Sequence, residues 1–108
     1  MSSRGPNPSE EQVSRVHDAL ARARGPLTLS RLIEDSSVPE RLARECVAQL
    51  VRSGVPIVSL GQGCGYELTR DPEKIRAEIA YIDSYVDSLR ARSRGLALNL
   101  PTQETLFS

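Results

Sequence analysis

The chain of 108 residues has few aromatic side chains and no net charge. It contains no Trp, one Phe and three Tyr, so a hydrophobic core must be built from aliphatic side chains. Its 14 basic and 14 acidic residues give a formal net charge of zero. Because phosphate contacts dominate nucleic-acid affinity, a neutral chain is not a general coating protein for DNA. Any nucleic-acid binding must therefore come from a local basic surface.

Long apolar runs and metal-ligand patterns are also missing. No run approaches the roughly 18 apolar residues that a membrane-spanning helix needs, and the first ten residues lack the apolar region of a secretory signal. Cys46 and Cys64 lie far apart, and His17 is the only histidine. We therefore expect a cytoplasmic protein with no membrane segment, no metal, no cofactor and no enzymatic activity.

A capping pattern marks the start of the first predicted helix. In Ser9-Glu10-Glu11-Gln12, the side chains of Ser9 and Gln12 can each accept a hydrogen bond from the backbone amide of the other. Apolar residues then recur at helical spacing to about Arg24, and Gly25-Pro26 ends the helix. The polar residues 1–8 are expected to form a disordered lead-in.

Two shorter helices are predicted next, after a short strand at 26–28. Thr28 is expected to cap a helix at 29–35, and Ser36-Ser37-Val38 forms a turn. Ser37 and Glu40 repeat the capping pattern and open a helix at 38–53. A helical wheel gives this helix one apolar side, formed by Leu42, Ala43, Cys46, Val47 and Leu50.

The opposite side of the helix at 38–53 is rich in arginine. It carries Arg41, Arg44, Glu45, Ala48 and Arg52. Arginine contacts guanine edges and phosphates, so this face fits a helix that reads duplex DNA. An exposed face of Arg and Glu also keeps many helices soluble. The charge pattern alone leaves both interpretations open.

Two strands, at 55–60 and 66–69, are joined by the loop Gly61-Gln62-Gly63-Cys64-Gly65. Its glycines allow a tight reversal and a close approach to another surface. The loop lies between two strands and contains no lysine, so it is not a phosphate-binding loop.

The last predicted helix, at 71–99, has Asp71 as its cap and an apolar seam. The seam follows the 4, 3, 4, 3 spacing of a coiled coil and consists of Ile75, Ile79, Ile82, Val86 and Leu89. With only two clean heptads, the seam either pairs with a second copy in a homodimer, which we favour, or packs on the first helix. Residues 71–89 carry five acidic and two basic residues, a net −3, whereas 90–108 carry three basic and one acidic, a net +2.

The order strand, helix, turn, helix and two strands is that of a winged helix-turn-helix. We therefore predict an α+β fold, mainly α, with this domain at 9–70 and a long C-terminal helix. Residues 11–70 resemble the N-terminal DNA-binding domain of bacterial biotin-operon repressors. The resemblance rests on Leu50-Val51-Arg52-Ser53-Gly54-Val55-Pro56-Ile57-Val58 and Gly63-Cys64-Gly65-Tyr66-Glu67-Leu68. Small phage and prophage proteins are also similar, including an Asp-Pro-Glu that opens a long helix with Ser-Leu-Arg-x-Arg.

The resemblance implies a sequence-specific protein for double-stranded DNA, a dimeric bacterial or phage transcription regulator. Arg41, Arg44 and Glu45 match groove-facing positions, and Gln62 matches the wing. The DNA-binding residues expected in all are Ser37, Arg41, Arg44, Glu45, Ala48, Arg52 and Gln62. The wing carries no Arg or Lys, unlike many DNA-binding wings. A winged helix that binds proteins instead therefore stays a second hypothesis.

The C-terminal residues 100–108 are expected to form a flexible tail. Gln103, Leu106 and Phe107 resemble the peptide by which bacterial replication and repair proteins dock on the sliding clamp, although Glu104 departs from that motif. The alternative is that Leu106 and Phe107 fold back onto the domain. The resemblance implies the second function, an interaction module of a phage or bacterial replication assembly.

Overall fold

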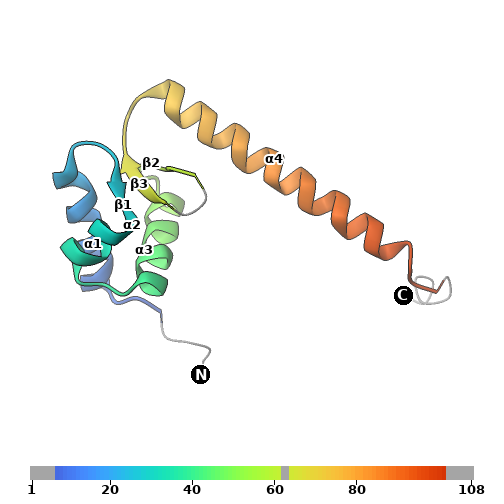
Figure 1. The fold of residues 1–108 in the computed structure, drawn as a ribbon, viewed down its shortest axis with the longest axis horizontal. Coiled ribbons are helices and arrows are strands. Elements are labelled where there is room, and N and C mark those ends of the chain that lie inside the picture. Colours follow the sequence, from blue (N-terminus) through green and yellow to red (C-terminus); the bar gives the residue numbers. More distant parts are fainter. Residues whose placement is uncertain (1–6, 62–63, 102–108) are drawn as a thin grey trace. The chain divides into compact units, whose positions relative to one another are not determined.

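The computed structural model of the protein describes residues 7–61 and 64–101 (Figure 1). The chain divides into two compact units, Met1–Ile75 and Arg76–Ser108. The elements in chain order are helix α1 (Glu10–Ala23), strand β1 (Leu27–Thr28), helix α2 (Leu29–Ser36), helix α3 (Glu40–Arg52), strands β2 (Ile57–Ser59) and β3 (Gly65–Leu68), and helix α4 (Pro72–Ala97).

Helix α1 begins with the predicted capping box. The Ser9 hydroxyl accepts from the Gln12 amide at 3.1 Å, and Gln12 Oε1 accepts from the Ser9 amide at 2.9 Å. Glu10 and Glu11 in the first turn favour the positive end of the helix dipole. The cap prediction for α2 is also confirmed, because Thr28 Oγ1 accepts from the Arg31 amide at 3.2 Å.

The prediction that Ser37 caps the third helix is wrong. Ser37 takes a left-handed backbone conformation, with φ +59°, and its N–H donates to the Ile33 carbonyl, so it ends α2. The buried Ser36 hydroxyl accepts from the Val38 amide at 3.2 Å. Helix α3 therefore begins only at Glu40, after Pro39, which makes no side-chain cap bond. The turn is short because one left-handed residue reverses the chain.

Among the described residues, the strands form a three-stranded antiparallel sheet in the order β1-β3-β2. Leu27 and Thr28 pair with Tyr66 and Gly65, and Ile57 pairs with Leu68. Gly65 lies so close to β1 that a Cβ atom there would overlap the Leu27 carbonyl oxygen. The predicted close approach of a loop glycine to another surface is thus found at Gly65, and the surface is β1.

The core of the first unit is aliphatic, as the composition requires. Val16, Leu32, Val38, Ala43 and Cys46 are fully buried. Tyr66 and Leu68 of β3 pack against this cluster from the sheet. Cys46 is fully buried, which confirms its predicted place on the apolar side of the helix, and burial raises the pKa of its thiol. Helices α1, α2 and α3 surround the core (Figure 1).

The other side of β2 and β3 buries a charged residue. Glu67 pairs across the strands with Val58, and both side chains are buried. Both carboxylate oxygens of Glu67 accept from Lys74 Nζ, each at 3.1 Å. A buried carboxylate needs such a partner. The first turn of α4 is therefore tied to the sheet by an ion pair within the first unit.

Helix α4 begins after Asp71, whose Oδ1 accepts from the Glu73 amide at 3.0 Å. It continues through Gly95 to Ala97. None of its residues is buried. The elements together confirm the predicted fold class, a mainly helical α+β winged helix-turn-helix with a long C-terminal helix.

Candidate nucleic-acid interface

The predicted site residues of α3 lie together on one face of the helix. Because Ala43, Cys46, Val47 and Leu50 are buried in the core, the opposite face is turned to solvent. That face carries three exposed arginines, the half-buried Glu45 and the half-buried Ala48; the arginines are Arg41, Arg44 and Arg52. We call these five residues the α3 row. Along a 13-residue helix they span about 16 Å at a rise of 1.5 Å per residue.

Arg44 is held by a carboxylate of its own helix. Its Nε and Nη2 atoms donate to Glu40 Oε2 at 3.2 and 3.0 Å. The Glu40 hydrogen bond raises the pKa of Arg44, and Tyr66 of β3 acts in the same direction. Sequence reasoning did not find Tyr66 as a neighbour of Arg44, because only the fold brings β3 beside α3. The contact between Arg44 and a DNA phosphate or base would have to replace the Glu40 bond.

The other two arginines of the α3 row differ from each other. Arg52 Nη2 lies 3.4 Å from Glu45 Oε2. Arg41 forms no ion pair or side-chain hydrogen bond with any residue that the structure describes. Arg41 is therefore the arginine of the row whose guanidinium can meet a phosphate or a guanine without losing a partner.

Two predicted DNA-binding residues lie outside the α3 row. Ser37 is exposed in the turn between α2 and α3, where it ends the earlier helix instead of capping α3. Gln62 lies outside the described residues, as do the tail residues Gln103, Leu106 and Phe107. The described part of the β2–β3 loop is anchored to the helix-turn-helix, because the Leu29 amide donates to the Cys64 carbonyl at 2.9 Å.

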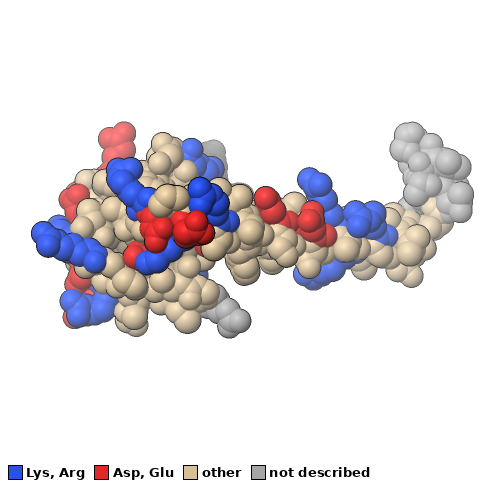
Figure 2. All heavy atoms as spheres, turned by 90° about the horizontal axis from the view of Figure 1, so that it is seen from above, with Lys and Arg blue, Asp and Glu red and all other residues tan. Residues whose placement is uncertain are grey.

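The charges are mixed on the face of the molecule that Figure 2 shows, where acidic side chains lie directly beside basic ones. The ion pairs explain this, since Arg15, Arg31 and Arg44 each lie beside a carboxylate three or four residues away. Exposed pairs of this kind contribute little to stability. They do lower the positive potential that would attract a nucleic acid.

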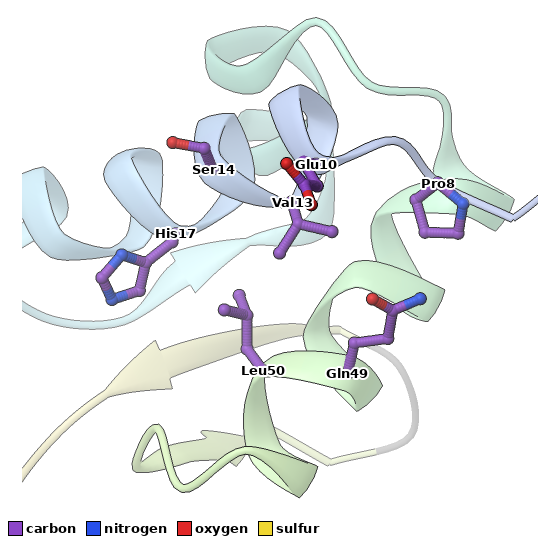
Figure 3. Close-up of a pocket in the computed structure, with 7 residues that line it drawn as sticks. All are labelled: Pro8, Glu10, Val13, Ser14, His17, Gln49 and Leu50. Atoms are coloured by element: carbon purple, nitrogen blue, oxygen red, sulfur yellow. The ribbon is translucent and has the colours of Figure 1, made fainter.

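A hollow of about 280 Å³ lies between α1 and α3, on the side of α3 away from the row. It is lined by Pro8, Glu10, Val13, Ser14, His17, Gln49 and Leu50. Figure 3 shows the side chains of Val13 and Leu50 facing each other across it. His17 also lines the hollow and is half-buried. The residues that line the hollow include no Arg or Lys, so the hollow adds no basic side chain to the arginines of α3.

The predicted dimerisation seam is mostly exposed. Ile79, Ile82 and Leu89 are 53%, 44% and 40% exposed, and Val86 is also exposed. Ile75, which belongs to the first unit, is half-buried. The seam residues therefore offer an apolar surface that the described residues of the chain do not cover.

None of the helices in the described residues has both the length and the hydropathy that crossing a membrane requires. Within residues 7–61 and 64–101, no three His, Cys, Asp or Glu side chains lie in a group that could hold a metal ion.

No family model matches the chain, and no curated protein matches it. Among solved structures, the chain is similar to Sso10a-2, a DNA-binding protein from Sulfolobus solfataricus. The similarity has a TM-score of 0.43 and 18% sequence identity, and it covers 87% of this chain and 98% of that chain. A similarity at this level carries no argument about function.

Proposed function

We propose that the chain is a sequence-specific protein for double-stranded DNA, a dimeric bacterial or phage transcription regulator that reads the major groove with α3. The observation that supports this most is the α3 row, five side chains left exposed or half-exposed on the second helix of a helix-turn-helix. This helix is the one that enters the groove when a helix-turn-helix binds duplex DNA.

Each member of the row suits a different contact. Arg41 and Arg44 suit guanine edges or phosphates, and Arg52, at the end of α3, suits the backbone. Glu45 can accept from a cytosine amino group, and the Ala48 methyl can touch a thymine methyl. The row therefore combines donors, an acceptor and an apolar contact, which is what base readout needs.

Most of the affinity for DNA comes from two copies of the chain that bind one site together, each through its α3 row. The zero net charge and a wing without Arg or Lys leave few phosphate contacts to each copy. Two copies on a two-fold site double these contacts, with half-site centres about 10 base pairs apart or a multiple of that. The protein acts in the cytoplasm by binding its DNA site, and it needs no catalysis, cofactor or metal to do so.

The experiment is selection of a binding site from random duplexes, followed by titration of the selected site at several salt concentrations. Arg44→Ala should weaken binding to that site by roughly 1–3 kcal/mol, because a base or phosphate contact is lost. Arg15→Ala on α1 is the matched control, since Arg15 forms the same kind of exposed pair, with Glu11. It should leave the affinity within about twofold.

A second variant tests the competition between carboxylate and DNA. Glu40→Gln removes the charge that holds Arg44, so it should tighten binding several-fold. Glu11→Gln removes an equivalent charge beside Arg15 and should change binding much less. Equal effects of the two variants would mean that only net charge matters and that Arg44 does not read the site.

No selective binding at low salt would overturn the proposal. The interaction module of a replication assembly would then be the better hypothesis, with the exposed apolar residues of α4 as the observation that favours it. The sliding clamp would be the first partner to test through Gln103, Leu106 and Phe107.

A further inference from the structure

Helix α4 carries apolar side chains that are not packed into a core. The helix has 26 residues, none of them buried. Most helical stability in proteins comes from packing an amphipathic face rather than from intrinsic propensity. The spacing of Ile79, Ile82, Val86 and Leu89 is that of a coiled-coil seam. The helix therefore needs a partner helix along this seam.

The charges of α4 are separated along its length. Asp71 caps the helix, and its acidic residues, Glu73, Glu78, Asp83 and Asp87, all lie before Leu89, together with two basic residues, Lys74 and Arg76. The C-terminal part carries only basic residues, Arg90, Arg92 and Arg94. Figure 2 shows the acidic side chains of the helix nearer its N-terminus and basic ones nearer its C-terminus.

We propose that a second copy of the chain covers the α4 seam in the antiparallel direction. The inference rests on the dimer of the proposed function, and it does not need DNA binding. In an antiparallel pair the acidic half of each helix lies beside the basic half of the other. In a parallel pair, acidic halves meet acidic halves and basic halves meet basic halves.

The charges also select a register. We place Val86 beside Leu89 of the second copy and Ile79 beside Leu96 of the second copy, so that the seam is covered from Ile79 to Leu89. Ser93, which interrupts the apolar run, then faces Ile82. Leu96 is 73% exposed in the single chain, and this register gives it an apolar neighbour.

The residues that flank the seam agree with this register. Asp83 lies beside Arg90 of the second copy, and the Tyr85 ring lies beside Arg92 of the second copy, where a cation can rest on an aromatic face. Each contact occurs twice by symmetry. The parallel arrangement would put Glu78 beside Asp83 of the second copy. An antiparallel register shifted by one heptad toward the start of α4 would put Asp83 beside Asp83 of the second copy. Both alternatives place like charges together, which is destabilising.

The arrangement fixes where the two winged helices are attached. Each α4 begins two residues after the domain at 9–70, so an antiparallel pair has one domain at each end. In the proposed register the two starts of α4 lie about 46 Å apart, from roughly 31 residues at a rise of 1.5 Å. A parallel pair would attach both domains at the same end.

Disulfide formation in solution tests the direction. Two variants, Ile79→Cys and Leu96→Cys, are made separately and carry tags of different length so that their products can be told apart. Both also carry Cys64→Ser, and the buried Cys46 is left in place. On mild oxidation of the mixture we expect the mixed product, 79 joined to 96. A parallel pair separates these positions by about 25 Å and would give only like-with-like products, 79 to 79 and 96 to 96, which would overturn the inference.

Charge reversal gives a second readout, the dimer dissociation constant from sedimentation. Asp83→Arg should weaken the dimer roughly tenfold, because two attractive contacts become repulsive, and Asp83→Arg with Arg90→Asp should restore it. Asp87→Arg is the matched control, since residue 87 points away from the seam, and it should have little effect. In a parallel dimer Asp83→Arg would face Glu78 and tighten association, which would contradict the proposal.

These measurements separate the inference from the proposed function. An antiparallel dimer that shows no selective DNA binding would defeat the proposed function alone. A parallel dimer that binds its site would defeat the inference alone. A chain that stays monomeric at millimolar concentration, with circular dichroism showing intact helices, would overturn the second copy as the partner of α4.

Discussion

The two units of the chain use the same kind of apolar pattern with opposite results. In Met1–Ile75, residues at helical spacing such as Val16, Leu20 and Leu32 are almost completely buried. In α4 a seam of equal regularity is 37–53% exposed from Ile79 to Leu89. The periodicity of a helix therefore says which face is apolar, but it does not say whether the covering surface lies in the same chain.

Their arginines differ in the same way. Arg44 and Arg52 of α3 lie within 3.4 Å of carboxylates of their own helix. Arg90, Arg92 and Arg94 of α4 form no ion pair with any residue that the structure describes. These two arginines of the first unit are paired within their own helix, whereas the three at the end of α4 have no ion-pair partner among the described residues.

The largest expected difference between the units is in core stability. Leu32→Ala removes a fully buried side chain from the first unit and should lower its free energy of unfolding by about 2–5 kcal/mol. Leu89→Ala truncates a side chain of the same type in α4. It should change the stability of the first unit by less than about 0.5 kcal/mol. Amide hydrogen exchange at Ala43 and Val47 measures that unit alone.

The result of Leu89→Ala decides whether the comparison holds. A loss of more than 1 kcal/mol at the α3 amides in dilute solution would mean that α4 stabilises the first unit. In that case the two units would not be energetically separate, and the apolar seam would have a role inside the chain.

Glycine provides the next contrast. Gly65→Ala would push a methyl group into the backbone of β1, so we expect a loss of about 1–3 kcal/mol. Gly95→Ala meets open space in the last turns of α4 and should instead stabilise that helix by up to about 1 kcal/mol. Urea denaturation measures the first effect, and helicity by circular dichroism measures the second. A neutral Gly65→Ala would show that β1 is not held against β3 in solution.

Local signals in the sequence predicted most of the fold. The capping box at Ser9, the cap at Thr28 and the apolar side of α3 all depend on residues a few positions apart, and all are confirmed. The partly buried ion pair of Glu67 and Lys74 was not predicted. Its partners belong to a strand and the following helix, and their contact depends on the angle at which the chain turns between them.

The candidate site was predictable only as a helix face. The wheel placed Arg41, Arg44 and Arg52 on the exposed side of α3, where the structure has them. It could not show that Glu40 holds Arg44 while Arg41 pairs with none of the residues that the structure describes, because rotamers decide between neighbouring acidic and basic side chains. The roles of these residues toward DNA stay predictions.

The smallest expected effect concerns the two caps that the sequence treated alike. Thr28→Ala removes the hydroxyl that accepts from the Arg31 amide, so it should cost about 1 kcal/mol. Ser37→Ala should cost less than about 0.5 kcal/mol, because Ser37 is exposed and ends α2 through its backbone N–H rather than its side chain. Thermal denaturation of the two variants side by side measures the difference. Equal losses would mean that Ser37 caps α3 in solution, and α3 would then begin at residue 38 as the sequence predicted.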